Sequence, residues 1–401
     1  MNPAVRLRRF ALYICFFVPG IAMASWVTRT PAIRDLIDAS TAQMGLVLLG
    51  LSIGSMTGVL STTPLLRRFS TRPVIVVGAS LIILGTAVIG LGAALTLGPV
   101  VFIGLVLFGA GVGSEEIAVN VEGAAVERLI ERPVLPALHG SYSLGTVIGA
   151  LIGIAFTAIS FPVEWHLLLV AVIAVPAMIW AIRHIPFGEG LASADDAAQL
   201  GAAGATTTRS LLRDRRLILI GVVVLAMAFA EGSASDWLPL LMVDGHGFTA
   251  TSGSLVYAGF AAAMTIGRFF GGPLIVRFGR VAVLRGSAVI AGLGLLVVIF
   301  ADNPILAGLA VILWGLGASL GFPVSLSAAG DSGPDSSRRV GLAATAGYIA
   351  FLVGPPLLGF LGEHFGLRIA MLAVLVLLTA SVFAAPAARQ CLERREAMQE
   401  S

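Results

Sequence analysis

PLLRRF at residues 64–69 and PLIVRF at residues 273–278 each end a long apolar segment, and they lie 209 positions apart. At the same offset Gly50 matches Gly259 and Gly58 matches Gly267. The offset is about half of the 401 residues, so it spans one complete copy of a repeated unit. Self-similarity over so long a period predicts two related structural halves.

The composition excludes an ordinary water-soluble protein. Charged residues make up 12% of the chain, against roughly 25% in soluble domains. The hydrophobic fraction is 57%, and so few charges cannot cover that much apolar surface in water. Backbone groups in lipid must bond internally, which leaves helices or a closed barrel. The apolar runs are continuous rather than alternating, so we predict membrane-spanning helices of roughly 20 residues each.

We predict an all-α membrane protein with twelve transmembrane helices in two pseudo-symmetric six-helix bundles. The first bundle covers residues 1–186, a cytoplasmic linker rich in Ala, Gly and Thr covers 187–214, and the second bundle with a short cytoplasmic tail covers 215–401. The expected spans are roughly 10–28, 42–63, 73–95, 98–120, 137–160, 164–184, 216–239, 251–275, 281–300, 304–325, 339–361 and 367–387.

The basic residues predict the orientation. All 25 are arginines, and with a cytoplasmic N-terminus 22 of them lie on the cytoplasmic side or at its boundary. Only Arg29, Arg34 and Arg368 fall outside. This bias is what the positive-inside rule describes, so both termini are expected in the cytoplasm. The net charge of +3 is then explained by anionic lipid and membrane potential, and no nucleic-acid partner is expected.

Glycines recur every four residues on two of the spans. Gly50, Gly54 and Gly58 do so on the second span, and the fifth carries a similar run at 145, 149 and 153. Spacing by four places them along one helix face and lets a neighbouring backbone approach closely, so we expect them to serve packing.

Carboxylates inside the spans are candidates for function, because a charge in hydrocarbon is costly and normally faces a cavity or a partner. Glu115 and Glu116 come late in the fourth span, and Asn120 shares a helix face with Glu116. Glu231 lies deep in the seventh span. The alternative for Glu115 and Glu116 is a capping role at the cytoplasmic interface, if the span ends earlier.

Two charges lie at the matching outer ends of the first and seventh spans. Arg29 and Asp236 are expected to pair across the two halves when the outer side is closed. The alternative for Asp236 is an ordinary interfacial residue beside Trp237, since Trp favours that depth.

Together these features resemble the major facilitator superfamily over essentially the whole chain. Residues 277–280, RFGR, match the end of the family signature, although Val276 and Arg67 stand where that signature usually has Asp. Glu116 and Asn120 resemble the Glu-x-x-x-Asn of the fucose–proton symporter branch, with Val121 in place of the following Pro. The stretches around Glu231, His139 and Tyr348 are similar to poorly characterised bacterial members related to that branch.

The resemblance implies a secondary active transporter that works by alternating access and moves a small polar solute, sugar-like in preference, together with protons. The implied proton-coupling or substrate residues are Glu116, Glu231, Asn120 and Glu115. Candidates for the substrate cavity, whose alternative role is packing or interfacial anchoring, are Trp26, Tyr142, Trp237, Tyr348 and Trp314. Candidates for a cytoplasmic gate are His139, Arg68 and Arg277.

Other expectations complete this interpretation. Five scattered histidines and two cysteines supply no nucleophile or metal cluster, so we expect no enzyme, cofactor or metal. The partners are expected to be the solute, protons and the lipid bilayer, and the protein a functional monomer in a bacterial inner membrane. Two alternatives remain open, which are proton-driven efflux of amphiphilic drugs or metabolites and a non-transporting membrane sensor on the same fold.

Overall fold

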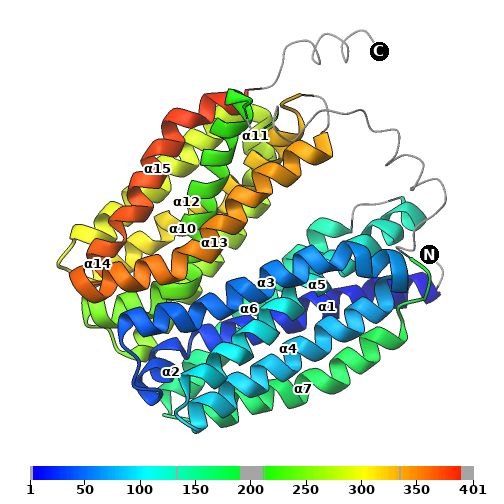
Figure 1. Cartoon of the computed structure of the whole chain (residues 1–401), viewed down its shortest axis with the longest axis horizontal. Helices are drawn as coiled ribbons and strands as arrows, with labels where there is room; N and C mark the ends of the chain where they lie inside the picture. The colour runs from blue at the N-terminus through cyan, green and yellow to red at the C-terminus, as the bar shows by residue number, and fades with distance from the viewer. Residues whose placement is uncertain (1–2, 132–133, 190–210, 212, 334–335, 390–401) are drawn as a thin grey trace. The chain divides into compact units, whose positions relative to one another are not determined.

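The computed structural model describes residues 3–131, 134–189, 211, 213–333 and 336–389. The described residues up to 189 form helices that lie side by side as a bundle (Figure 1). In chain order these are α1 (Pro3–Val27), α2 (Thr30–Leu36), α3 (Thr41–Phe69), α4 (Thr71–Ala94), α5 (Gly98–Ile130), α6 (Leu135–Ala158) and α7 (Val163–Arg183).

The described residues after the linker form a second set of helices. They are α10 (Arg215–His246), α11 (Ala250–Phe300), α12 (Pro304–Gly330), α13 (Ser336–Phe365), α14 (Leu367–Ala370) and α15 (Leu372–Ala384), followed by a short 3-10 helix at Ala385–Ala388.

Twelve spans are present in the described part of the chain, as predicted. Eleven helices are long and apolar enough to cross a membrane, but α11 has 51 residues and is two helices in one. Gly279 has φ 78° and ψ 160°, outside the helical range, and divides α11 near the predicted boundary between the eighth and ninth spans. The orientation of the termini stays a prediction.

Contacts between residues divide the chain into two compact units. Unit 1 contains residues 1–201 and 248–258, and unit 2 contains 202–247 and 259–401. The start of α11 therefore belongs to unit 1, where Ser254 Oγ donates a hydrogen bond of 2.9 Å to the carbonyl oxygen of Thr28. Sequence reasoning did not separate this segment from the second bundle. Most of the predicted linker, at 190–210 and 212, lies outside the described residues.

Polar side chains cap several helix starts, which explains where these helices begin. Ser40 accepts a hydrogen bond from the backbone N–H of Gln43, and the Gln43 side chain accepts one from the backbone N–H of Ser40, which is a capping box. Asp214 caps α10, and Asn303 caps α12. Each cap satisfies backbone donors that the first helical turn leaves unpaired.

The recurring glycines bring helices into close contact, as expected. A Cβ added at Gly50 would lie 2.7 Å from the carbonyl oxygen of Phe102 on α5. A Cβ added at Gly149 would lie 2.5 Å from the carbonyl oxygen of Ile21 on α1. No side chain larger than hydrogen fits at these distances, so the glycines set the spacing of α3 against α5 and of α6 against α1.

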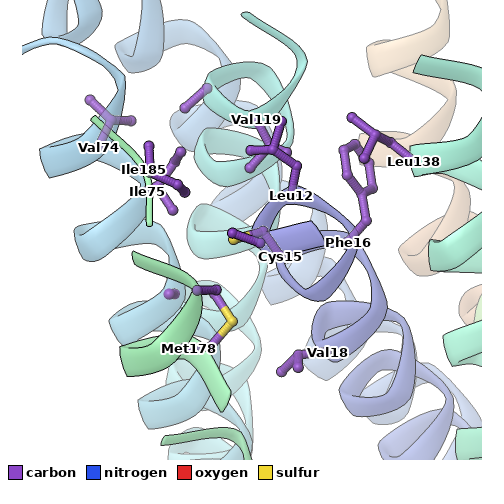
Figure 2. Packing of buried hydrophobic residues seen from close by; sticks show 14 of the residues in the cluster. Leu12, Cys15, Phe16, Val18, Val74, Ile75, Val119, Leu138, Met178 and Ile185 are labelled. Atoms are coloured by element: carbon purple, nitrogen blue, oxygen red, sulfur yellow. The ribbon is translucent and has the colours of Figure 1, made fainter. Parts of the chain in front are cut away.

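Unit 1 contains a cluster of buried apolar side chains. Figure 2 shows Leu12, Cys15 and Phe16 of α1 gathered with side chains of neighbouring helices. The labelled partners are Val74 and Ile75 of α4, Val119 of α5, Leu138 of α6 and Met178 of α7. Two buried carboxyl groups, those of Glu115 and Glu122, also lie in unit 1.

Candidate functional site

Two adjacent glutamates in the middle of α5 differ in burial. Glu116 is exposed, whereas Glu115 is 2% exposed. A Cβ added at Gly78 would lie 2.8 Å from the Cβ of Glu115, so α4 covers this residue. Neither carboxyl oxygen of Glu115 has a hydrogen-bond partner among the described residues. Glu115 thus points into unit 1 and Glu116 points out of it.

Helix α5 extends well beyond Glu116, and the alternative of a capping role at the interface stays a prediction. Helix α5 continues to Ile130, ten residues past the predicted end of the span at 120. Glu116 lies 18 residues from Gly98, about 27 Å at 1.5 Å per residue, and 14 residues from Ile130. It is therefore a mid-helix residue. Asn120, one turn further on, is half-buried on the same face.

Unit 2 also has a carboxylate in the middle of a helix. Glu231 lies 16 residues into α10, and its side chain is 23% exposed. It accepts a hydrogen bond of 2.8 Å from Arg268 of α11, whose side chain is 43% exposed. The two residues form an accessible ion pair at a depth where a lone charge would be costly.

Arg29 is held inside unit 1. Its guanidinium donates to Thr157 Oγ1 at 2.9 Å and to the carbonyl oxygen of Phe161. Burial lowers the pKa of Arg29, against the opposing influence of the Glu164 carboxylate. Asp236 is buried in unit 2 at 6% exposed. The expected pairing of Arg29 with Asp236 stays a prediction.

The five aromatic candidates fall into two groups. Trp26, Trp237 and Trp314 are at most 1% exposed, and Trp26 and Trp314 pack edge-on against Phe108 and Phe260. In this arrangement the three tryptophans are core side chains, which matches their alternative packing role. The remaining two candidates, at 142 and 348, are half-buried tyrosines on α6 and α13.

The candidates for a gate lie at helix ends. Arg68 and Arg277 are exposed, and each guanidinium stands over the ring of the next residue, at 5.2 Å for Phe69 and 5.3 Å for Phe278. His139 is exposed near the start of α6, with its ring centroid 4.9 Å from that of Phe16. The two arginines belong to different units, and a gating role for any of the three stays a prediction.

Sequence reasoning missed two charged pairs. Arg268 was grouped with the cytoplasmic arginines, yet it lies ten residues, about 15 Å, before the end of its helix at Phe278. Glu122 fell just past the predicted end of the fourth span, but it is fully buried and accepts a hydrogen bond of 2.8 Å from Arg8 Nε. The available signal was the charge itself, since a charged residue within a span normally faces a cavity or pairs with another group.

No group of three or more His, Cys, Asp or Glu side chains in the described part of the chain is arranged to hold a metal ion. Unit 1 offers carboxylates, one amide and a tyrosine, and unit 2 offers a carboxylate, a tyrosine and an accessible guanidinium. Groups of these kinds suit binding of polar groups and exchange of protons.

Comparisons with known proteins agree on one family. The model of the Major Facilitator Superfamily matches residues 137–340. An uncharacterised MFS-type transporter of Yersinia pestis is 28% identical over 366 residues, covering 91% of each chain.

Two solved structures share the fold at lower identity. A mutant of the nucleoside transporter NupG superposes with a TM-score of 0.75 at 16% identity, covering 96% of this chain and 100% of NupG. The Escherichia coli fucose:proton symporter FucP superposes with a TM-score of 0.62 at 19% identity, covering 97% of this chain and 100% of FucP.

Proposed function

The chain belongs to the Major Facilitator Superfamily as a multi-pass membrane transporter, and we propose that it is a proton-coupled carrier of a small polar solute. The solute is sugar-like in preference, the membrane is the bacterial inner membrane, and the mechanism is alternating access by the two units. FucP, which shares the fold, is a fucose:proton symporter.

One observation carries this proposal: each unit has an accessible carboxylate in the middle of a membrane-spanning helix. Glu116 of α5 is exposed, and Glu231 of α10 is 23% exposed. A sensor that had lost transport would have no need to retain charges that destabilise insertion. Intramembrane acids of this kind normally mark solute, ion or proton pathways.

The chemistry follows from the cost of moving a charge through a low-dielectric region. A carboxylate that meets water while open to one side can take up a proton and become neutral. The neutral or occupied form then passes through the closed state at a lower cost than the empty ionised form. Coupling arises because the protein changes sides most readily with proton and solute both bound.

In this proposal Glu116 exchanges the proton in unit 1, and Asn120 on the same face binds a hydroxyl of the solute. Tyr142 adds a half-buried hydroxyl group in unit 1, and Tyr348 adds one in unit 2. Glu115, which points into the bundle, serves the interior of unit 1 and does not meet the solute. The gate residues His139, Arg68 and Arg277 act near helix ends.

Thermal stabilisation of the detergent-purified protein tests the proposal. A ligand that binds only the folded state, at 100 times its dissociation constant, adds about 2.7 kcal/mol to the free energy of unfolding. We expect a hit among neutral sugars, sugar acids or nucleosides that weakens in Glu116→Gln and persists in Glu131→Gln, a matched change at the exposed end of α5. The same solute should raise external pH when added to proteoliposomes.

The other outcomes select the other functions. Stabilisation by cationic amphiphiles alone, with no sugar, sugar acid or nucleoside response, would identify efflux. Absence of any response, together with no solute-driven proton movement, would contradict transport and favour a sensor.

A further inference from the structure

The Glu231–Arg268 pair combines an accessible cation with an acid in one unit. Arg268 Nη2 lies 2.8 Å from Glu231 Oε1, and both residues are in unit 2. Arg268 and Glu231 neutralise each other, and removing either residue leaves the other without its charged partner. The pair is therefore stable as a pair, and an occupant that separates it must replace what it removes.

The face of α11 that carries Arg268 is small and polar. Ala261, Thr265, Arg268 and Gly272 follow one another at intervals of four, three and four residues, so they share a helix face. The exposed bulky side chains nearby, Ile266, Phe269 and Phe270, lie on a different face, which suits lipid. The exposed 43% of Arg268 therefore lies on a face of small side chains, apart from these bulky apolar residues.

Among the described residues of unit 2, few charged side chains other than Glu231 lie on the helices that pack against the middle of α10. Helix α10 packs against α12, α13 and α15, and of these α12 and α15 contain no charged residue. The charges of α13 lie near its ends, and its middle has Tyr348 as a titratable side chain. Asp236 is five residues beyond Glu231 on α10, which places it on another face. Glu231 is thus the acid that compensates the positive charge of Arg268.

We propose that Arg268 binds the carboxylate of an anionic solute, which takes the place of Glu231. This rests on the proposed carrier function and specifies its substrate class as small organic acids, sugar acids among them. The planar guanidinium matches a carboxylate in a two-bond geometry that a neutral hydroxyl cannot reproduce. A neutral sugar would have no charge with which to displace Glu231.

Charge balance links this binding to the proton. The empty pair has one positive and one negative charge and is neutral. An anion bound to Arg268 beside an ionised Glu231 leaves one uncompensated negative charge, whereas a proton on Glu231 restores neutrality. One anion and one proton therefore load together, and the loaded site carries the same net charge as the empty site.

The test compares solutes that differ in one group. D-glucuronate and D-glucose share a ring and differ by a carboxylate in place of a hydroxymethyl group, and D-gluconate and lactate extend the acids. The readout is the midpoint of thermal unfolding of the purified full chain at constant ionic strength. We expect at least one acid to stabilise the wild type, glucose to have no effect, and Arg268→Gln to weaken acid binding about tenfold or more.

Three further variants keep the result interpretable. Glu231→Gln frees Arg268 and should bind the acid more tightly than the wild type. Arg268→Gln with Glu231→Gln removes both charges, so it folds without an unpaired acid and should show no acid response. Arg285→Gln removes another exposed unit 2 arginine, one that bonds to the carbonyl oxygen of Val382, and should leave the acid response unchanged.

Two results would overturn the proposal. Equal stabilisation by glucose and the acids, unaffected by Arg268→Gln, would leave a proton-coupled sugar carrier standing and remove the anion site. No stabilisation of the wild type or Glu231→Gln by any acid would also remove it. The proteoliposome proton signal with neutral sugars or nucleosides then shows separately whether the carrier function itself survives.

Discussion

The two units have similar turns but different ion pairs at the end that adjoins the linker. We call this the linker end, marked in unit 1 by the turn at Arg68, Phe69 and Ser70 and in unit 2 by the turn at Arg277, Phe278 and Gly279. In each turn the arginine guanidinium lies over the ring of the phenylalanine that follows it. The third residue has φ 68° and ψ 175° in unit 1, and φ 78° and ψ 160° in unit 2.

An acid occupies the matching sequence position in each unit: Glu122 and Asp331 are also 209 residues apart. Glu122 is fully buried and bonded to Arg8 of α1 and Thr71 of α4. Asp331 is 34% exposed and bonded at 2.6 Å to Arg280, which matches Thr71. Both copies of the repeat have the acid, but its cation comes from a different helix in each unit. The ion pair is therefore determined by how the helices pack and not by the repeated sequence.

Arg8→Ala should have the largest effect. It leaves the Glu122 carboxylate buried without its cation, which costs roughly 3–5 kcal/mol of the free energy of unfolding. The matched change Arg280→Ala frees a partly exposed acid and should cost about 1 kcal/mol or less. Thermal unfolding of the purified variants measures both, and Arg8→Met with Glu122→Leu should recover most of the loss. Equal losses for the two alanine variants would contradict the difference in burial.

Gly50→Ala and Gly259→Ala should differ in sign. The new Cβ at Gly50 would lie 2.7 Å from a backbone oxygen, and overpacking of this kind costs roughly 1–3 kcal/mol. The matching Gly259 has nothing within 4 Å, so alanine there should gain up to about 1 kcal/mol through helix propensity. Denaturation midpoints of the two variants check the contrast. A loss at Gly259 as large as that at Gly50 would show that α11 is packed as tightly as α3.

Ser70→Gly should stabilise the protein by about 1 kcal/mol. Ser70 holds a backbone conformation that suits glycine, and its buried hydroxyl has no hydrogen-bond partner among the described residues. The reverse change, Gly279→Ser, should destabilise by a similar amount. The midpoint of thermal unfolding should therefore rise in the first variant and fall in the second. A fall in both would mean that the Ser70 side chain supports its turn.

The smallest effect concerns Asp214, which has no counterpart in unit 1, where Val5 stands 209 residues earlier. Asp214 Oδ2 lies 2.7 Å from Arg339 Nη2. Burial acts to raise the pKa of Asp214, but hydrogen bonds from Arg339 and the backbone N–H groups of Leu217 and Arg216 outweigh it, so the pKa lies below its usual range.

A carboxyl group with a lowered folded-state pKa stabilises the fold above its unfolded pKa, about 3.9 for aspartate, and loses that effect as pH falls through the folded value. The unfolding midpoint of the wild type should therefore exceed that of Asp214→Asn by a constant amount between about pH 7 and pH 5. The difference should shrink below about pH 4. A difference that persists unchanged to about pH 3 would assign the effect to capping geometry and not to charge.

Much of the architecture could be predicted from the sequence because it depends on local pattern. The 209-residue offset predicted the repeat, the apolar runs predicted twelve spans, and the glycine spacing predicted close helix contacts. Ends were less accurate, as α5 shows, because charged residues such as Glu122 stay helical when a partner compensates them. A short helix at Thr30–Leu36 was not predicted.

The candidate site shows where sequence reasoning ends. Periodicity shows that Glu115 and Glu116 face different directions on their helix, and it shows that Asn120 shares a face with Glu116. It does not say which face a neighbouring helix covers. Only the packing of α4 on α5 turned Glu115 inward, and only the approach of α10 and α11 joined Glu231 to Arg268.

The sequence by itself determined the all-α membrane class, the repeat, the spans and the charged residues within spans that are candidates for function. The reason is that lipid restricts composition and length along each helix. The tertiary structure decided which of those residues are accessible, which cation each acid has, and to which unit the start of α11 belongs. The physical reason is that burial and ion pairing are properties of two surfaces in contact, while a sequence pattern describes one surface at a time.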